Sequence, residues 1–193
     1  MPPSEHHRNS LIVIGNGTSL IEKEHGALID AFDDVLRFNA YKTEGYEKFT
    51  GAKTTIWFNV IPFQNKRHPL ILKPYRSVYL HTWQWDREKC KLWQALSPLF
   101  SCPVLKVERG TILELQEYAE DTDYFPYSSG MIAIWLMLKA HPRITITGFD
   151  WWEREKHHYS DNAVRGTLHK PEKEFRVIQK LQRDGRLKFL KEE

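Results

Sequence analysis

Short apolar runs alternate with helical segments along almost the whole chain. Runs of β-forming residues flanked by Gly, Pro or polar residues predict strands at residues 11–14, 35–38, 54–60, 77–81, 104–107, 143–147 and 187–190. Apolar residues at helical spacing predict helices at residues 19–32, 86–99, 111–119, 128–140 and 171–183. Strands that alternate with helices form a mostly parallel sheet covered on both faces. We therefore expect an α/β fold with one Rossmann-like, mostly parallel sheet over residues 11–193, after a polar lead-in over residues 1–10.

Composition narrows the class of protein. The chain has 193 residues, enough for one hydrophobic core. Its formal charge of +3 argues against a nucleic-acid partner. Cys90 and Cys102 have neither zinc nor redox spacing, which favours a reduced compartment. No apolar run reaches about 18 residues and the N-terminus lacks an apolar signal core, so we expect a cytoplasmic protein.

The stretch "LIVIGNGTSL" predicts a strand that ends in a glycine loop. Ligands of such folds bind beyond the carboxyl ends of the strands. A dinucleotide fingerprint needs a third glycine, but Leu20 stands there, so a dinucleotide site is not expected. Gly15 and Gly17 still permit close approach of the backbone, and a helix N-terminus favours an anion. A plain strand-to-helix turn is the alternative.

A second polar cluster, "YSSGM", opens an apolar helix. Ser128 and Ser129 can cap its backbone N–H groups. The same N–H groups, beside Gly130, can bind a phosphate or a ribose. One serine can cap the helix while the other faces a ligand.

The loop "GFDWWEREKHHYSDN" is rich in Trp and His. A flap over the core is one interpretation of it. A metal site of His157, His158 and Asp161 is disfavoured, because adjacent histidines rarely converge on one ion, and we expect no metal. A histidine that donates to a phosphate fits better.

His169 lies two residues before Pro171, at the start of a predicted helix. The positive end of the helix dipole disfavours an imidazolium there. A histidine that is neutral at neutral pH can act as a general base. The alternative is a polar surface residue, and Glu172 and Glu174 suit a first helical turn in either case.

Taken together, these stretches resemble the animal-type sialyltransferases, glycosyltransferase family 29. The first family motif resembles "LIVIGNGTSLIEKEHGALIDAFDDVLRFNAYKTEGYEKFTGAKTTIW", which includes Arg37 and Asn39. The second resembles "YSSGMIAIWLMLKAHPRITITGFD" and the third "HHYS". The last, His-x4-Glu, matches His169 and Glu174. The four motifs stand in the family's order over about two thirds of the chain, whereas residues 61–125 carry none.

The resemblance implies a GT-A-like fold and an inverting, metal-independent transfer of sialic acid from CMP-sialic acid to a glycan hydroxyl. It implies no cofactor besides that donor substrate. His169 would be the general base, and His158 would donate to the departing phosphate. Glu174 and Tyr159 would support the site. The implied nucleotide-sugar site comprises Asn16, Gly17, Asn39, Ser128, Ser129, Gly130, Gly148 and Phe149.

The chain also departs from the family. Golgi members have a membrane anchor and a disulfide between the first two motifs, but the matching positions here are Leu11 and His141. Both departures predict a bacterial or viral enzyme that works on the cytosolic side. The acceptor is expected to be a glycan or a lipid-linked saccharide. Peripheral contact of "LQRDGRLKFLKEE" with the inner face of an anionic membrane stays open.

Three functional hypotheses follow. The first is a sialyltransferase-like enzyme, with another CMP-activated ulosonic acid such as Kdo as the alternative donor. The second is a nucleotide- or glycan-binding protein without turnover, which would have no need for a base. The third is a single-stranded nucleic-acid binder that stacks bases on Trp83, Trp85, Trp151 and Trp152, which the mild charge disfavours.

Overall fold

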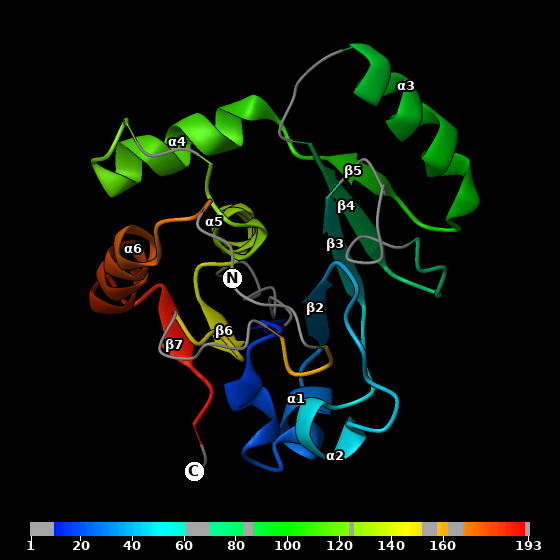
Figure 1. Cartoon of the computed structure of the whole chain (residues 1–193), viewed down its shortest axis with the longest axis vertical. Helices are drawn as coiled ribbons and strands as arrows, with labels where there is room; N and C mark the ends of the chain where they lie inside the picture. The colour runs from blue at the N-terminus through cyan, green and yellow to red at the C-terminus, as the bar shows by residue number, and fades with distance from the viewer. Residues whose placement is uncertain are drawn as a thin grey trace, which may run out of the picture.

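The seven strands found among the described residues form one parallel sheet (Figure 1). The computed structural model describes residues 10–60, 70–82, 87–123, 126–151, 158–161 and 168–191, without the side chains of residues 87–90 and 92. The sheet order is β5-β4-β3-β2-β1-β6-β7. The expected single parallel sheet is thus confirmed. Its strands are β1 (Leu11–Ile14), β2 (Asp34–Phe38), β3 (Ile56–Val60), β4 (Ser77–His81), β5 (Val104–Lys106), β6 (Ile144–Thr147) and β7 (Leu187–Phe189).

Strand β1 lies where the strand order reverses. Ile12 pairs with Val35 of β2 on one side and with Thr145 of β6 on the other. All four residues of β1 are buried, as expected for a strand covered on both faces. The crevice for a ligand is therefore expected at the carboxyl ends of β1, β2 and β6.

Helices cover both faces of the sheet (Figure 1). The helices α4 (Arg109–Ala119), α5 (Ser129–Ala140) and α6 (Pro171–Arg183) lie on one face, and α1 (Gly26–Asp30) and α2 (Glu47–Thr50) lie on the other. The helix α3 (Arg87–Leu96), continued by η2 (Ser97–Leu99), lies near β5. Because α5 is apolar on all sides, it can be buried at the centre of its layer, where Met131 and Ile134 are fully covered.

Alternate side chains of the central strands enter different cores. Leu11 and Val13 pack into the cluster that contains most of α5, whereas Ile12 and Ile14 pack with Leu20 and other residues on the α1 face. This alternation follows from the two-residue period of a strand. Among the described residues, no helix is long and apolar enough to span a bilayer.

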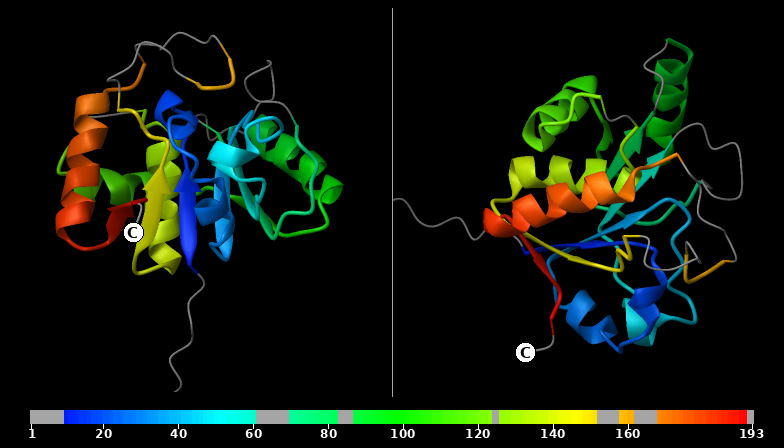
Figure 2. Two further views of the ribbon diagram at one scale, coloured as in Figure 1. Left: turned by 90° about the horizontal axis from the view of Figure 1, so that it is seen from below. Right: turned by 60° about the vertical axis from the view of Figure 1, so that its left-hand side comes forward.

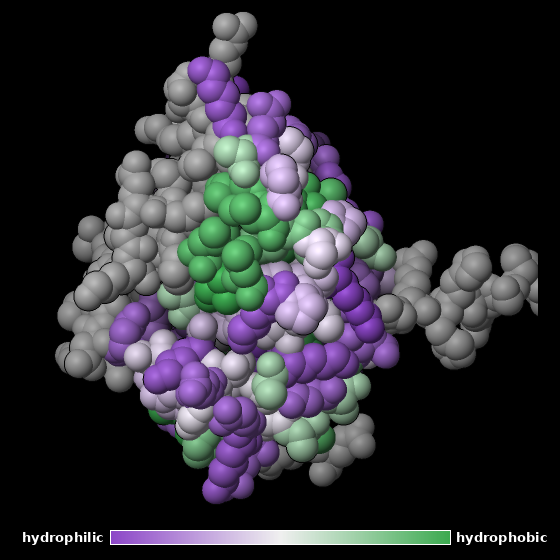
Figure 3. Space-filling view, turned by 90° about the vertical axis from the view of Figure 1, so that its right-hand side faces the viewer, coloured by the Kyte–Doolittle hydropathy of each residue, from purple (hydrophilic) through white to green (hydrophobic). Residues whose placement is uncertain are grey.

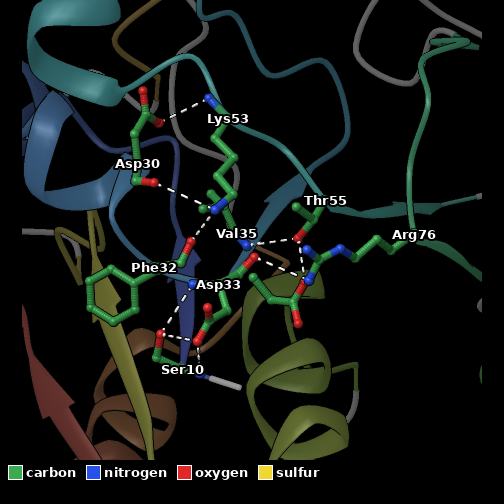
Figure 4. A network of polar contacts seen from close by, with 9 residues as sticks. Ser10, Asp30, Phe32, Asp33, Val35, Lys53, Thr55 and Arg76 are labelled. Atoms are coloured by element: carbon green, nitrogen blue, oxygen red, sulfur yellow. Dashed lines mark hydrogen bonds and ion pairs between the residues drawn. The ribbon is translucent and has the colours of Figure 1, made fainter.

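A polar network joins β1, β2 and β3 at their amino ends (Figure 4). The backbone N–H and hydroxyl of Ser10 donate to the Asp33 carboxylate at 2.8 and 2.9 Å. Thr55 and Arg76 both donate to Asp34 at 2.8 Å. These contacts fix the edge of the sheet opposite the expected site, so the polar residues there are structural.

Buried Arg37 organises the segment between β2 and β3. Its guanidinium donates to the carbonyls of Thr50 at 2.6 Å and Lys53 at 3.1 Å. Burial lowers the pKa of this guanidinium. Arg37 therefore holds the end of α2 against the sheet, and the "GYEKFTGAKTT" stretch of the first motif is mainly a packing unit.

The long helix predicted over residues 19–32 is wrong. The structure has a 3-10 turn, η1 (Thr18–Ile21), and then the five residues of α1. Residues 22–25 belong to neither helix, and Gly26 begins α1. A Cβ on Gly26 would lie 2.0 Å from the carbonyl oxygen of Glu47, so glycine there permits a close approach of α2 that was not predicted. The other predicted helices agree within three residues, and the strands within two residues, of the observed bounds.

One flank of the molecule carries an apolar area amid hydrophilic surface (Figure 3). This flank contains α3, η2, β5 and the segment before β4. The exposed leucines of these elements include Leu72, Leu99 and Leu105. Cys102, in the same region, is a free thiol. The apolar area thus accompanies the edge strand β5 rather than the expected site.

Candidate functional site

The loops after β1 and β6 meet at the carboxyl edge of the sheet, which faces upward in the left panel of Figure 2. The N–H groups of Gly15 and Gly17 donate to the carbonyls of Thr147 and Gly148, each at 2.8 Å. A Cβ on Gly15 would lie 2.1 Å from the Gly148 carbonyl oxygen. Gly148 itself has a φ of +72°, which favours glycine. Both glycines are therefore required for this contact between the two motif loops.

The carboxylate of Asp150 fills the anion position of the first loop. It accepts hydrogen bonds from the Thr18 hydroxyl at 3.1 Å and from the backbone N–H of Ser19 at 3.3 Å. The Ser19 hydroxyl also donates to it. A Cβ on Gly17 would lie 2.6 Å from this carboxyl group. The hydrogen-bond donors of this loop that could bind an anion are thus occupied by the carboxylate of Asp150 from the same chain.

Asn16 and Asn39 lie at the ends of neighbouring strands. The Asn16 side-chain amide donates to the Phe38 carbonyl at 3.4 Å. Asn39 has a φ of +46°, a conformation that asparagine tolerates better than most residues. Its side-chain oxygen accepts from the Val60 N–H at 3.3 Å. The structure brings these two predicted residues to one place and fixes both by hydrogen bonds to the ends of β2 and β3.

Ser128 caps α5 and binds Glu174 of α6. Its hydroxyl accepts from the Met131 N–H at 3.2 Å and donates to the Glu174 carboxylate at 2.6 Å. The Ser128 N–H donates to the same carboxylate at 2.6 Å. Glu174 is completely buried. The predicted capping by Ser128 is confirmed, and the buried Glu174 joins the start of α5 to α6. Ser129, the first residue of α5, remains partly exposed.

His169 is held just before α6. Its Nδ1 lies 3.0 Å from the carbonyl oxygen of Pro126. Since a carbonyl can only accept, Nδ1 carries the hydrogen and Nε2 of the neutral ring carries the lone pair. The predicted position of His169 before a helix that starts with Pro171 is confirmed.

The segment 158–161 is attached over the end of β1. The Tyr159 N–H donates to the Asn16 carbonyl at 3.0 Å, and its hydroxyl donates to the Lys42 carbonyl. The buried Tyr159 ring packs edge-on against Tyr46, and burial raises the pKa of its hydroxyl. Tyr159 therefore anchors the segment beside Asn16. Next to it, His158 Nδ1 lies 3.1 Å from the Asp161 carboxylate.

Aromatic contacts connect the two halves of this edge. The Phe149 ring packs against Phe38 of β2, with ring centroids 6.1 Å apart. A Cβ on Gly130 would lie 2.8 Å from the Phe149 ring. Trp151 stacks on Phe149 at 5.4 Å and meets Phe175 of α6 at 5.9 Å. The loop after β6 thus reaches both the start of α5 and α6.

The predicted site residues form two groups. One gathers Asn16, Gly17, Asn39, Gly148 and Tyr159 around the ends of β1, β2 and β6. The other gathers Ser128, Glu174 and the Pro126 carbonyl that holds His169 at the starts of α5 and α6. Phe149 and Gly130 join them.

One residue of the site was missed by the sequence analysis, and several predicted residues lie outside the part of the chain that the structure describes. Asp150 was missed, since its partners lie about 130 residues away in the sequence and leave no local signal. His157, Trp83, Trp85 and Trp152 lie outside the described residues. Within the part of the chain that the structure describes, no three His, Cys, Asp or Glu residues are placed to hold a metal ion.

The fold and several sequences connect the chain to known proteins. Residues 2–67 match the family model of glycosyltransferase family 29 (sialyltransferase). The beta-1,6-galactosyltransferase GALT29A of Arabidopsis thaliana is 28% identical over 95% of this chain and 54% of its own length. Sialyltransferase-like protein 1 of Oryza sativa subsp. indica is 30% identical over 79% of this chain and 47% of its own length. The chain is thus similar in sequence to members of glycosyltransferase family 29 (sialyltransferase) and to sialyltransferase-like plant proteins.

A crystal structure of a mammalian sialyltransferase superimposes with a TM-score of 0.72. The superposition covers 96% of this chain and 70% of that chain at 20% identity, which establishes the GT-A-like fold of the family. The chain spans about half the length of the curated relatives named above. These relatives come from plants, so the bacterial or viral origin stays a prediction.

Proposed function

We propose that this protein is an inverting, metal-independent transferase that moves sialic acid from CMP-sialic acid to a glycan hydroxyl. The observation that carries the proposal is the hydrogen bond from His169 Nδ1 to the Pro126 carbonyl at 3.0 Å. It leaves Nε2 as the basic nitrogen of a ring placed before α6. A general base with this tautomer suits an acceptor hydroxyl.

The proposed reaction is a single displacement. The acceptor hydroxyl gives its proton to Nε2 of His169 while its oxygen bonds to the anomeric carbon of the donor sugar. The bond from that carbon to the phosphate oxygen breaks, and CMP leaves with the electron pair. Attack opposite to the leaving group inverts the anomeric centre.

His158 is proposed to stabilise the leaving phosphate. Asp161 accepts from its Nδ1 and so orients the ring, and in the proposed role a hydrogen on Nε2 is donated to the phosphate. Tyr159 anchors this segment to Asn16, so the donor would lie near the first loop. A single phosphate can be stabilised by such donors, each worth about 3–4 kcal/mol in a transition state. The proposal therefore involves no metal ion.

The position of the donor phosphate is inferred from the hydrogen-bond donors that Asp150 does not occupy. Since Asp150 occupies the hydroxyls of Thr18 and Ser19, a second anion there would meet a like charge. Ser129 and Gly130 open α5, a helix of twelve residues whose dipole favours an anion at this end. We therefore assign the CMP phosphate to this helix start.

A second candidate is transfer of galactose. It is favoured by the Arabidopsis relative, which is a galactosyltransferase and aligns with 95% of this chain. Transfer of Kdo from CMP-Kdo is a further alternative for the same nucleotide site. The two CMP donors differ only in the sugar, whereas UDP-galactose differs from both in nucleotide and sugar, so one comparison of the three donors separates the candidates.

The test measures donor binding and sugar transfer in EDTA with CMP-sialic acid, CMP-Kdo and UDP-galactose. Transfer from CMP-sialic acid is expected, and His169→Ala should lower it by about 10²–10⁴-fold with CMP affinity unchanged. His141→Ala is the matched control, because His141 lies at the far end of α5. Undiminished transfer by His169→Ala would refute the role of His169 as the general base. Transfer from UDP-galactose alone would refute CMP-sialic acid as the donor.

A further inference from the structure

A pocket lies between the end of α4 and the outer side of α6, which are neighbours in Figure 1. Its volume is about 350 Å³, within the range of small-ligand sites. The floor includes Ala119, Tyr127 and Val177. None of the catalytic roles assigned above falls on a residue that lines it.

The pocket is basic. Four cations of α6 line it at helical spacing: Lys173, Arg176, Lys180 and Arg183. Asp121 pairs with Lys173 at 2.6 Å, and Glu120 pairs with Lys180 at 2.5 Å. These two carboxylates neutralise the lysines and leave a net charge of +2 on the lining.

Arg176 and Arg183 carry this excess charge. Both are exposed, and within the described part of the chain neither makes an ion pair or a hydrogen bond. They are seven residues apart on α6, so their Cα atoms are about 10 Å apart along the helix. The fork of a guanidinium matches a carboxylate or a phosphate. The lining is therefore suited to a ligand with two separated acid groups.

The pocket adjoins the proposed catalytic edge. Tyr127 lines the pocket and directly precedes Ser128. The helix α6 begins two residues after His169, presents Glu174 to Ser128 and presents Arg176 to the pocket. Measured along the helix from Pro171, its first residue, Arg176 lies about 8 Å and Arg183 about 18 Å away.

We propose that this pocket binds an acidic saccharide through Arg176 and Arg183, and that it is the acceptor side of the enzyme. The acceptor role rests on the proposed function, whereas the binding itself does not. The charged side chains that line the pocket suit a hydrated saccharide chain. A chain with acid groups on alternate sugars would present one to each guanidinium while its end lies at His169.

The test measures binding of a hyaluronan hexasaccharide, with chitohexaose as an uncharged hexasaccharide of similar length. Arg176→Gln/Arg183→Gln should bind hyaluronan about tenfold more weakly, as the loss of two exposed ion pairs predicts. Lys188→Gln/Lys191→Gln is the matched control, since it removes the same charge from exposed lysines outside the pocket. Circular dichroism verifies that both variants fold.

The proposal is supported if hyaluronan binds, chitohexaose does not, and only the arginine variant weakens the binding. An equal loss of hyaluronan affinity in both variants would show that only the net charge matters, and it would overturn the assignment of this pocket as the binding site. Binding of inorganic pyrophosphate in the pocket without binding of hyaluronan would overturn the proposal that its ligand is a saccharide. Loss of transfer by His169→Ala is a separate readout, so failure of the transferase and failure of this pocket are distinguishable.

Discussion

At the residue scale, His81 is a buried titratable side chain to which the proposed reaction assigns no role. It ends β4 and is only 1% exposed, with its ring 6.2 Å from that of Phe58. Burial lowers the pKa of His81 to about 4. An unfolded chain would bind a proton at this histidine near pH 6.5, so the unfolded state holds more protons between pH 4 and pH 6.5.

Stability is therefore expected to fall as the pH drops from 6.5 to 4. The contribution of His81 is fully present above pH 6.5 and is lost toward pH 4, at most about 3 kcal/mol. The unfolding free energy of His81→Gln should depend less on pH across this window than that of the parent chain. Denaturant titrations from pH 4 to 7 measure this, with His141→Gln as control. If the unfolding free energy of His81→Gln depended on pH as strongly as that of the parent chain, His81 would not be the cause of the pH dependence.

At the element scale, Glu174 joins α5 and α6. Replacing Glu174 by Ala leaves the N–H and hydroxyl of Ser128 without their buried partner. The expected cost is about 3 kcal/mol, which lowers the melting temperature by roughly 6–12 °C. Thermal unfolding by circular dichroism measures the shift.

Glu172→Ala provides the comparison for Glu174→Ala, because Glu172 is an exposed residue in the same turn. Its effect on the unfolding free energy should stay within about 0.5 kcal/mol. Equal melting temperatures of the two variants would contradict the role given to Glu174. The conservative Glu174→Gln should lose less stability than Glu174→Ala, since an amide oxygen still accepts one of the two hydrogen bonds.

The elements show which parts of the fold a sequence can predict. Strands β1 to β7 were all predicted, because each is a short apolar run with a polar or glycine boundary. The helix predicted over residues 19–32 was wrong, since the structure divides it into η1 and α1, and the approach of the α2 backbone to Gly26 is a contact that depends on tertiary packing. Short elements such as α2 lack enough turns to show helical periodicity.

The candidate site was predictable only where its residues follow a strand or open a helix. Asn16, Gly148 and His169 stand at such positions, and the structure places them at one edge of the sheet. The bond from His169 to the Pro126 carbonyl and the carboxylate of Asp150 are long-range contacts. Neither contact leaves a periodic pattern in the sequence, so neither can be predicted from it.

At the scale of the whole molecule, the contact of Gly15 with Gly148 joins the two parts of the sheet on either side of the β1–β6 boundary. A methyl group at Gly15 would lie 2.1 Å from a backbone oxygen that cannot move alone. Gly15→Ala should therefore cost about 3 kcal/mol or more of unfolding free energy and weaken donor binding. Denaturant unfolding and CMP titration measure the two effects.

Gly110→Ala is the matched glycine control for Gly15→Ala. It lies in α4, and a Cβ there would have nothing within 4 Å. Alanine in a helix is more stable than glycine, so a gain of about 0.5 kcal/mol is expected. If Gly15→Ala were as stable as Gly110→Ala, the close contact between the two loops would be refuted.

The place of β1 in the sheet also has a consequence during synthesis on the ribosome. Its partner β2 follows within about 20 residues, but its partner β6 follows about 130 residues later. At 5–20 residues per second, β1 waits roughly ten seconds for β6 after it emerges. During that time the apolar residues of β1 present one unpaired flank, as an edge strand would. The growing chain, rather than the finished fold, is thus the form in which β1 is exposed to association with other chains.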